Sequence, residues 1–459
     1  MFLIHVLLAY QLEQYEAMRF LKFIYQRPIF WIKSSQRQQI DWTNKMIVIL
    51  VLSLILCFLL NILIFNVYGW FVLLSVCITF LCYPILVIVS NTLISPIDWM
   101  IKKIIVYRAK SNLKKHSQLK IVGITWSYGK TSTKEYLKTI LSSEFNVIAT
   151  PWTHNTEIWI SKFILQYLKK DTQILLLEMW AYLPWDIQKL CDISQLDIWV
   201  ITGITEQHLE RFWNINNIIK TKFELTKNIK KWWLFVFDEV NPYIKVWIDT
   251  YKNNLKTIKQ IWIGKLNVNY VANLWGIEFE FDTVKYSSKL LWKHNATNLA
   301  LAISIAKSLW MKENNIQTQV SRIDFVPHRL QLIQNNNGVY VVDDSFNGNI
   351  EWVKSTIDLV KNTHNTRKLY LTPWLVELWD KAEEVHIEIG KLLADAVDKV
   401  LLIQNSTTKY IKAWLLKNGF NADNIKIYDT ALKAHEDLKN ILQKWDIIVF
   451  QNDWTDNYL

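Results

Sequence analysis

Two long apolar stretches near the N-terminus restrict most strongly what this chain can fold into. Residues 46–65 read MIVILVLSLILCFLLNILIF, and residues 71–90 read FVLLSVCITFLCYPILVIVS. Each has about the 20 residues that a helix needs to cross a bilayer, and only NVYGW separates them. We therefore predict a tight hairpin of two transmembrane helices, in which Pro84 is tolerated because membrane helices accommodate proline. Two buried core helices of a soluble domain are the alternative.

Basic residues flank the predicted hairpin on both sides. Those before it are Arg19, Lys22, Arg27, Lys33, Arg37 and Lys45, and those after it are Lys102, Lys103, Arg108, Lys110, Lys114 and Lys115. Because lysine and arginine concentrate on the cytoplasmic side of a membrane, we predict a multi-pass protein of the cell membrane with cytoplasmic domains. Neither stretch is a cleaved signal peptide, because both lie far from Met1. The run YEAMRFLKFIYQRPIFW within residues 1–31 is typical of an interfacial helix.

The balance between glycine and tryptophan is unusual. The chain has 10 glycines and 24 tryptophans among 459 residues, and the two types together number 34. That sum is close to the usual glycine share of about 7%. Trp185 follows Pro184, as glycine does in a turn, and Trp232 and Trp233 directly precede the apolar run LFVF. We interpret most tryptophans as glycine positions, which arises when UGA codons for glycine are translated as tryptophan. A tryptophan-rich protein with few turns is the alternative.

Charge and cysteine content limit the classes of partner. The formal net charge is +11, which favours anionic partners such as nucleotides or an anionic membrane face. We predict no nucleic-acid partner. Cys57, Cys77 and Cys82 lie in apolar runs and Cys191 stands alone, so neither a disulfide framework nor a zinc site is predicted.

From about residue 116 the pattern changes to apolar strands that alternate with amphipathic helices. Alternation of this kind predicts an α/β fold with parallel sheets. A new unit begins near the sequence VPHRLQLI. We therefore predict an N-terminal membrane region over residues 1–115, a central domain over 116–316 and a C-terminal domain over 317–459.

The sequence GITWSYGKTSTKEYL, residues 123–137, resembles a phosphate-binding loop between a strand and a helix. In such loops backbone amides cradle phosphates, a lysine reaches the terminal phosphate and a hydroxyl meets Mg²⁺. Gly129, Lys130 and Thr131 would take these roles. The strict pattern requires glycine where Ile124 stands, so a surface helix start is the alternative.

Three further residues are weak candidates when each is taken alone. Glu178 ends the apolar run ILLLEM, and a carboxylate at a strand end points toward the ligand crevice of α/β folds and suits Mg²⁺. His208 follows the next apolar run, and Lys222 lies in the sequence KTKFEL. Each also has a purely structural alternative: Glu178 as a solvated acid at a strand end, His208 as a structural histidine and Lys222 as a solvated lysine on a helix.

Seven segments, in order, resemble the motifs of the Mur ligase family. They are GITWSYGKTSTKEYL, TPWTHNTEIWISKFIL, LLLEMWAYLPWDI, ITGITEQHLERFW, WKHNATNLALAISIAKSL, VPHRLQLI and DDSFNGNIEWVKSTIDLV. The resemblance covers about residues 118–459 and is strongest to the branch that adds D-alanyl-D-alanine. Within these segments several tryptophans stand where the family carries glycine, namely Trp126, Trp152, Trp159, Trp180, Trp213, Trp292 and Trp352.

The resemblance implies an ATP- and Mg²⁺-dependent ligase of peptidoglycan synthesis. ATP would phosphorylate the terminal carboxylate of a UDP-muramoyl tripeptide, and the amine of D-alanyl-D-alanine would then attack the acyl phosphate. It also implies a central ATP-binding domain with a parallel sheet, followed by a Rossmann-like C-terminal domain.

The resemblance also assigns roles to individual residues. Lys130, Lys222, His208 and Glu178 would be catalytic, and the metal ligands would be Thr131, Glu178, His208 and a carbamylated Lys222. The residues implied to bind ATP are Gly123, Trp126, Ser127, Gly129, Lys130, Thr131, Ser132, Asn295, Asn298, Arg329 and Asp344, with Asn295 and Asn298 on the adenine side. His154, Asn155, Thr156 and Asn347 would face the substrate.

One departure from the family leaves alternatives open. The N-terminal domain that grips the UDP moiety is not recognisable, and the predicted membrane hairpin stands in its place. A lipid-linked or otherwise altered acceptor is therefore open, as is a membrane-bound poly-γ-glutamate-type synthase of the same superfamily. If Trp126 is genuine, an inactive membrane scaffold is the third possibility.

Overall fold

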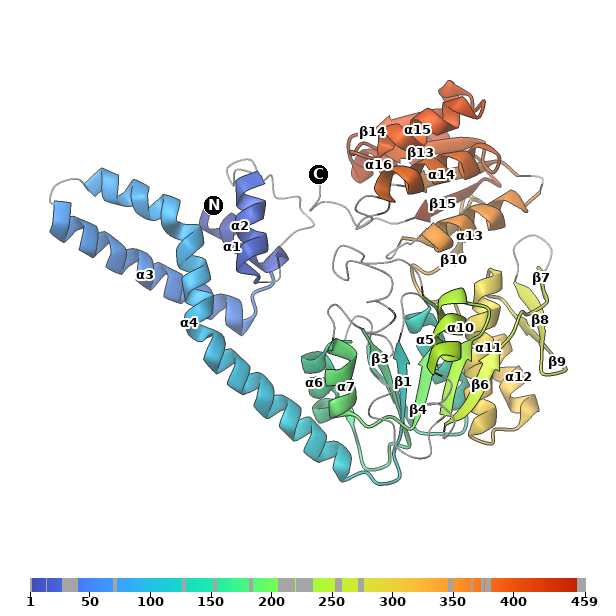
Figure 1. Ribbon diagram of the computed structural model, residues 1–459. Helices are drawn as coiled ribbons and strands as arrows, with labels where there is room; N and C mark the ends of the chain where they lie inside the picture. Colours follow the sequence, from blue (N-terminus) through green and yellow to red (C-terminus); the bar gives the residue numbers. More distant parts are fainter. Residues whose placement is uncertain are drawn as a thin grey trace. The chain divides into compact units, whose positions relative to one another are not determined.

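The computed structural model divides the chain into two units, Met1–Tyr107 and Arg108–Leu459 (Figure 1). The residues that it describes are 2–13, 15–26, 40–68, 72–125, 129–151, 155–180, 185–204, 219, 234–251, 258–270, 276–345, 350–364, 366–372, 375 and 381–451.

The first unit is built from helices. They are α1 (Phe2–Leu12), α2 (Ala17–Gln26), α3 (Asn44–Tyr68) and α4 (Val72–Lys114), of which α4 continues into the second unit. Val6 and Tyr10 of α1 share a buried cluster with Met46 of α3 and Tyr83 of α4, so the short apolar helix packs on the two long ones. Asp98 of α4 forms ion pairs with Lys45, at 3.1 Å, and with Lys102, at 2.8 Å.

By length and composition, α3 and α4 are both able to cross a membrane. Large apolar side chains on them are exposed, for example Phe58, Leu63 and Leu81. A soluble core helix would bury such side chains, whereas a lipid-facing helix exposes them. The second helix is longer than predicted, because α4 continues past residue 90 to Lys114.

A six-stranded parallel sheet forms the core of the central region, in the order β2-β3-β1-β4-β5-β6. Its strands are β1 (Lys120–Thr125), β2 (Val147–Ala149), β3 (Ile174–Met179), β4 (Ile198–Ile201), β5 (Leu234–Asp238) and β6 (Lys259–Ile263). The helices between them are α5 (Lys130–Leu141), α6 (Glu157–Tyr167), α7 (Asp186–Ile193) and α10 (Pro242–Tyr251). Strands β1, β3 and β4 are almost wholly buried, as apolar runs in parallel sheets are.

A small antiparallel sheet and two helices complete this region. The sheet contains β7 (Val268–Tyr270), β8 (Ile277–Phe281) and β9 (Val284–Ser288). The helices are α11 (Lys293–Ser308) and α12 (Glu313–Arg322). Helix α11 buries alanine, leucine and isoleucine side chains and packs against α5, as Figure 1 shows.

The C-terminal region is a second α/β layer structure. Its sheet has the order β10-β11-β15-β12-β13-β14, and β10 alone in it is antiparallel to its neighbour. The strands are β10 (Gln331–Gln334), β11 (Tyr340–Asp344), β12 (Lys368–Thr372), β13 (Lys399–Ile403), β14 (Ile425–Tyr428) and β15 (Ile447–Gln451). The helices are α13 (Ile350–Lys361), α14 (Ala382–Ala394), α15 (Thr408–Lys417) and α16 (Ala431–Ile441). The predicted α/β fold with parallel sheets is confirmed, whereas the domain limits at 115/116 and 316/317 stay predictions.

Tryptophan occupies left-handed backbone positions in the described residues. Of the nine non-glycine residues there with positive φ, four are tryptophans: Trp185, Trp292, Trp310 and Trp445. Bulky side chains are rarely found in this region, which is the natural place of glycine. The observation supports the interpretation of these tryptophans as glycine positions.

The ends of helices α15 and α11 allow glycine and tryptophan to be compared directly in the same motif. After α15, Gly419 has φ 78° and donates to Leu416 O, while Phe420 donates to Leu415 O. After α11, Trp310 has φ 64° and donates to Lys307 O, while the next amide donates to Ala306 O. Both patterns are the Schellman motif, whose left-handed residue is usually glycine. Trp310 therefore stands where the matched helix carries glycine.

We expect the gene to carry UGA at most tryptophan positions, including Trp310 and Trp126. The natural protein would then contain glycine at both positions, and at position 310 this removes the roughly 1–2 kcal/mol that a left-handed conformation costs other residues. Codon sequencing and peptide mass spectrometry of protein from the natural host give the answer. UGG codons at both positions would overturn the interpretation.

Candidate functional site

The candidate phosphate loop joins the end of β1 to the start of α5. Gly129 precedes the helix with φ 79°, and a Cβ there would lie 2.8 Å from Asn298 Oδ1. Glycine is therefore required by both the backbone conformation and the close approach of α11. Trp126 and Ser127, which were predicted to bind ATP, lie outside the described residues. Gly123 lies inside β1, where a Cβ would meet Leu196 Cδ1 at 2.4 Å, so packing accounts for this glycine.

Lys130 opens α5 and is half-buried. Burial lowers the pKa of its ammonium group to about 8; the Glu178 carboxylate opposes this shift and the Arg329 guanidinium adds to it. Two cationic side chains that lie close enough to affect one another's charge, at a partly buried place, together attract an anion. Phosphate is an anion of this kind.

Glu178 and Thr131 meet at the carboxyl end of the central sheet. Glu178 lies in β3 beside Ile124 of β1 and is 3% exposed. The hydroxyl of Thr131 donates to Glu178 Oε2 at 3.0 Å and lies 3.2 Å from Oε1. A hydroxyl and a carboxylate are oxygen ligands of the type that Mg²⁺ prefers. These two predicted ligands are therefore together and suit the metal.

Helix α11 places two asparagines against α5. Asn295 accepts a hydrogen bond from Tyr136 Oη at 2.9 Å and donates to Leu291 O at 2.6 Å, so its side chain joins the helices. Asn298 is 2% exposed, and its Nδ2 atom has no hydrogen-bond partner among the residues that the structure describes. A buried donor beside Gly129 without a partner suits a nucleotide with acceptor oxygens. Ser132, in the first turn of α5, is also buried.

The predicted substrate segment runs beside the same strand end. The amide of Trp180 donates to Asn155 O at 3.3 Å, and Thr156 immediately precedes α6. His154 lies outside the described residues. The segment thus follows β2 and lies next to β3, which carries Glu178.

Arg329 and Asp344 come from the C-terminal region. Burial lowers the pKa of Arg329, while Asp344, Glu178 and Tyr136 raise it, so the guanidinium lies within electrostatic reach of the phosphate loop helix. Its two neighbours, His328 and Leu330, both have positive φ. Such backbone strain of about 1–3 kcal/mol per residue is concentrated at functional sites.

Asp344 is 2% exposed and accepts hydrogen bonds from Gln451 Nε2, at 2.9 Å, and from the amide of Leu330, at 3.3 Å. Burial raises its pKa to about 7, against the effects of Arg329 and Gln451. Asn347, His208 and Lys222 lie outside the described residues. The residues that are described contain no group of three His, Cys, Asp or Glu side chains able to hold a metal.

Two models of known protein families match this chain. The Mur ligase middle domain matches residues 124–306, and the Mur ligase glutamate ligase domain matches residues 328–451. The chain belongs to the Mur ligase family. As a Mur ligase it is an ATP-dependent ligase that joins an acid to an amine.

This Mur ligase is similar to curated enzymes named UDP-N-acetylmuramoyl-tripeptide–D-alanyl-D-alanine ligase. The enzyme of Synechocystis is 26% identical over 340 residues, which cover 72% of this chain and 71% of the relative. That of Bacillus subtilis is 23% identical over 337 residues, 72% of each chain. Among solved structures, MurF ligase of Thermotoga maritima in complex with ADP has a TM-score of 0.65 and 25% identity, over 76% of this chain and 80% of its own.

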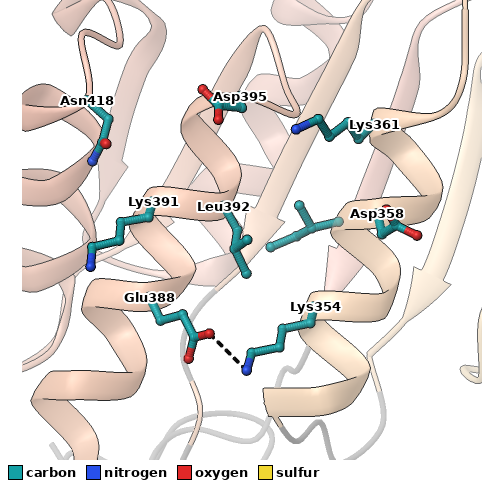
Figure 2. A pocket seen from close by; sticks show the side chains of 9 residues that line it. Lys354, Asp358, Lys361, Glu388, Lys391, Leu392, Asp395 and Asn418 are labelled. Carbon is teal, nitrogen blue, oxygen red and sulfur yellow. Dashed lines mark ion pairs between the residues drawn. The ribbon is translucent and has the colours of Figure 1, made fainter.

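A pocket between α13 and α14 of this Mur ligase lies apart from the strand ends that carry Glu178 and Asp344. Figure 2 shows Lys354 facing Glu388, and their ion pair measures 2.8 Å. Three lysines and three carboxylates line this pocket. Because the charges balance, the pocket is not suited to a nucleotide phosphate.

Sequence reasoning missed a buried charge beside Glu178 of this Mur ligase. Lys134 lies one turn after Lys130 and is 0% exposed, within 3.3 Å of Glu178. Its spacing gave a signal, because Lys134 precedes Leu137 and Leu141 by three and seven residues on the buried face of α5. A lysine at that position must have buried partners.

We expect two buried groups to give opposite pH dependences of stability. Asp344 has a folded pKa of about 7 against an ordinary 3.8, so the folded chain binds more protons and stability falls as pH rises between these values. Burial, aided by Lys293, lowers the pKa of His294 from 6.5 to about 4, so stability rises with pH over that window. The contributions of Asp344 and His294 to the pH dependence of stability therefore largely cancel each other in the unmodified protein.

Single variants separate the two effects. In Asp344→Asn, the free energy of unfolding relative to that of the unmodified protein should rise with pH between about 4 and 6.5, by at most about 1.4 kcal/mol per unit. The comparison with the unmodified protein is needed because burial also raises the pKa of Asp238, to about 6, and that group acts in both proteins. In His294→Gln it should fall with pH over the same window. Denaturant unfolding of the full chain at several pH values measures both slopes. Equal slopes in the two variants would refute the assignment.

Proposed function

We propose that this Mur ligase adds D-alanyl-D-alanine to the terminal carboxyl group of a UDP-muramoyl tripeptide in peptidoglycan synthesis. The main support is that relatives named for this reaction match over 72% of the chain, with a solved structure that holds ADP among them. Two observations support ATP as the energy source. The hydrogen-bonded side chains of Thr131 and Glu178 suit Mg²⁺, and the buried Nδ2 donor of Asn298 suits a nucleotide.

The proposed mechanism depends on positioning and charge. Lys130 contacts the β- and γ-phosphates, and Arg329 with Asp344 reaches the nucleotide from the C-terminal region. Thr131 would hold one Mg²⁺ and carbamylated Lys222 a second, with Glu178 and His208 as further metal ligands, and the metal would neutralise the phosphate charge. His154, Asn155, Thr156 and Asn347 orient the peptide. Its carboxylate attacks the γ-phosphate and releases ADP, and the amine then displaces phosphate to form the amide.

An ADP-release assay with defined acceptors tests this proposal. The full chain with glycine at the tryptophan positions, given ATP and Mg²⁺, should release ADP steadily only when the UDP-muramoyl tripeptide and D-alanyl-D-alanine are both present. Glutamate in place of the dipeptide should give background release. Faster release with glutamate would support a poly-γ-glutamate-type synthase, and release only with a lipid-linked peptide would change the acceptor. Either result contradicts the proposal as stated.

We propose further that α3 and α4 cross the cell membrane, with the catalytic regions in the cytoplasm. The exposed apolar side chains of both helices and the basic residues on both flanks support this topology.

We expect both ends of the hairpin to lie in the cytoplasm. Lysine and arginine on either flank disfavour translocation of either end. Reporter fusions after residues 40 and 112 should both report the cytoplasm, and a fusion between α3 and α4 should report the opposite side. An external signal from either end would disprove the topology.

A further inference from the structure

Lys134 is a buried charge that the mechanism above does not use. Its Nζ atom donates to Thr150 O at 2.7 Å and lies 3.3 Å from both Glu178 Oε2 and Glu135 Oε1. An ammonium group has three donors, so the three acceptors match it. Its side chain is 0% exposed, which keeps the ammonium group from touching a ligand. Lys134 therefore acts through the groups that it holds.

The first of these groups is Thr150, which follows β2 directly. Thr150 is the first residue of the segment 150–156, which contains the residues proposed to orient the peptide. Its hydroxyl accepts a hydrogen bond from the amide of Glu178 at 3.0 Å, and its amide donates to Leu176 O at 3.0 Å. The start of the segment is thus fixed to β3 by its own atoms and to α5 by Lys134.

The second group is the carboxylate of Glu178. Its Oε2 atom is shared between the ammonium of Lys134 and the hydroxyl of Thr131. Helix α5 therefore holds the end of β3 from two successive turns. The outer turn provides Thr131 of the phosphate loop, and the inner turn provides Lys134, which also reaches Thr150. One side chain connects the nucleotide side of the site to the peptide side.

We propose that Lys134 is a positioning residue that sets the peptide segment in register with the phosphate loop. The inference rests on the proposed function, since it assigns segment 150–156 to the peptide. Burying an ammonium group is unfavourable unless its partners compensate, and an apolar side chain of similar size would often serve stability equally well. A positioning role gives a reason for a lysine here. Without it, the segment loses its tie to α5, while the phosphate loop keeps its place at the helix start.

Lys134→Met in the full chain tests this role, because methionine keeps the length of the side chain and removes the donors. The control is Lys138→Met, one turn further on the same helix, where the lysine is exposed. Hydrogen exchange should become at least tenfold faster in the fragment that contains Thr150 and Asn155, and remain unchanged in β1. The KM for the muramoyl peptide should rise at least tenfold, with the KM for ATP changed by less than threefold. Lys138→Met should change none of these.

Two results would overturn the proposal. One is faster exchange throughout α5, β1 and β3, which indicates a general loss of stability. The other is an equal rise in both KM values, which places the effect at the nucleotide. If Lys134→Met does not fold, Lys134→Gln, whose donor is uncharged and one bond closer to the backbone, should show the same changes in exchange and in KM to a smaller extent. A protein with glycine at the tryptophan positions, Lys134 intact and no ligase activity would refute the proposed function alone, since the exchange measurement still decides on Lys134.

Discussion

Replacing Trp126 by glycine is expected to raise the affinity for ATP a few hundred-fold. Residue 126 lies outside the described residues, between the end of β1 at Thr125 and the left-handed Gly129. A phosphate loop brings backbone amides within about 2.7–3.2 Å of phosphate oxygens, and glycine permits that approach. An indole would fill the phosphate site or displace the turn. Losing two charge-assisted hydrogen bonds, at about 1.5–3 kcal/mol each, accounts for the factor.

The comparison requires two full-length proteins that differ only at residue 126, with the other tryptophan positions set to glycine in both. Calorimetry with Mg²⁺ and a non-hydrolysable ATP analogue gives the two affinities. As a matched control, position 414 in α15 is returned to tryptophan, which should leave the affinity unchanged. Equal affinities with Trp126 and glycine would show that residue 126 does not line the phosphate site.

Lys130→Met is expected to lower kcat/KM about a thousandfold. The lost ammonium group is proposed to stabilise the charge that develops on the phosphates, and one such interaction is worth about 10²–10³ in rate, with weaker ATP binding in addition. The fold should be at least as stable, because burial lowers the pKa of Lys130, so its charged form is disfavoured in the folded state. Steady-state kinetics and thermal unfolding of the full chain measure both effects. A loss of rate that follows a loss of stability would contradict this role, as would unchanged kcat/KM.

The regular elements could be predicted because the chain signals them locally. The apolar runs of β1 and β3 and the small buried face of α11 are of this kind. The length of α4 could not be predicted, because its last turns are polar and lie beyond the apolar stretch. The antiparallel sheet of β7, β8 and β9 also went unpredicted, since its strands are only three to five residues long.

The candidate site likewise contains residues that could be predicted from the sequence and residues that could not. Glu178 was accessible from the sequence because it lies near the end of a buried strand, and in the structure its carboxylate accepts a hydrogen bond from Thr131. For Lys134 the helical spacing indicates the buried face, but its partners Thr150 and Glu178 could not be predicted, because they are distant in the sequence. The raised pKa of Asp344 likewise depends on burial beside Gln451, which only the folded sheet creates.

The fate of a carboxylate oxygen tests the central claim most directly. If the enzyme forms an acyl phosphate and then an amide, one oxygen of the tripeptide's terminal carboxylate must leave with the phosphate. The full chain, with glycine at the tryptophan positions, is incubated with ATP, Mg²⁺, D-alanyl-D-alanine and a tripeptide carrying heavy oxygen in that carboxylate. Mass spectrometry should find one labelled phosphate for each extended peptide formed. Phosphate release without labelled oxygen, or without an extended peptide, would contradict the account.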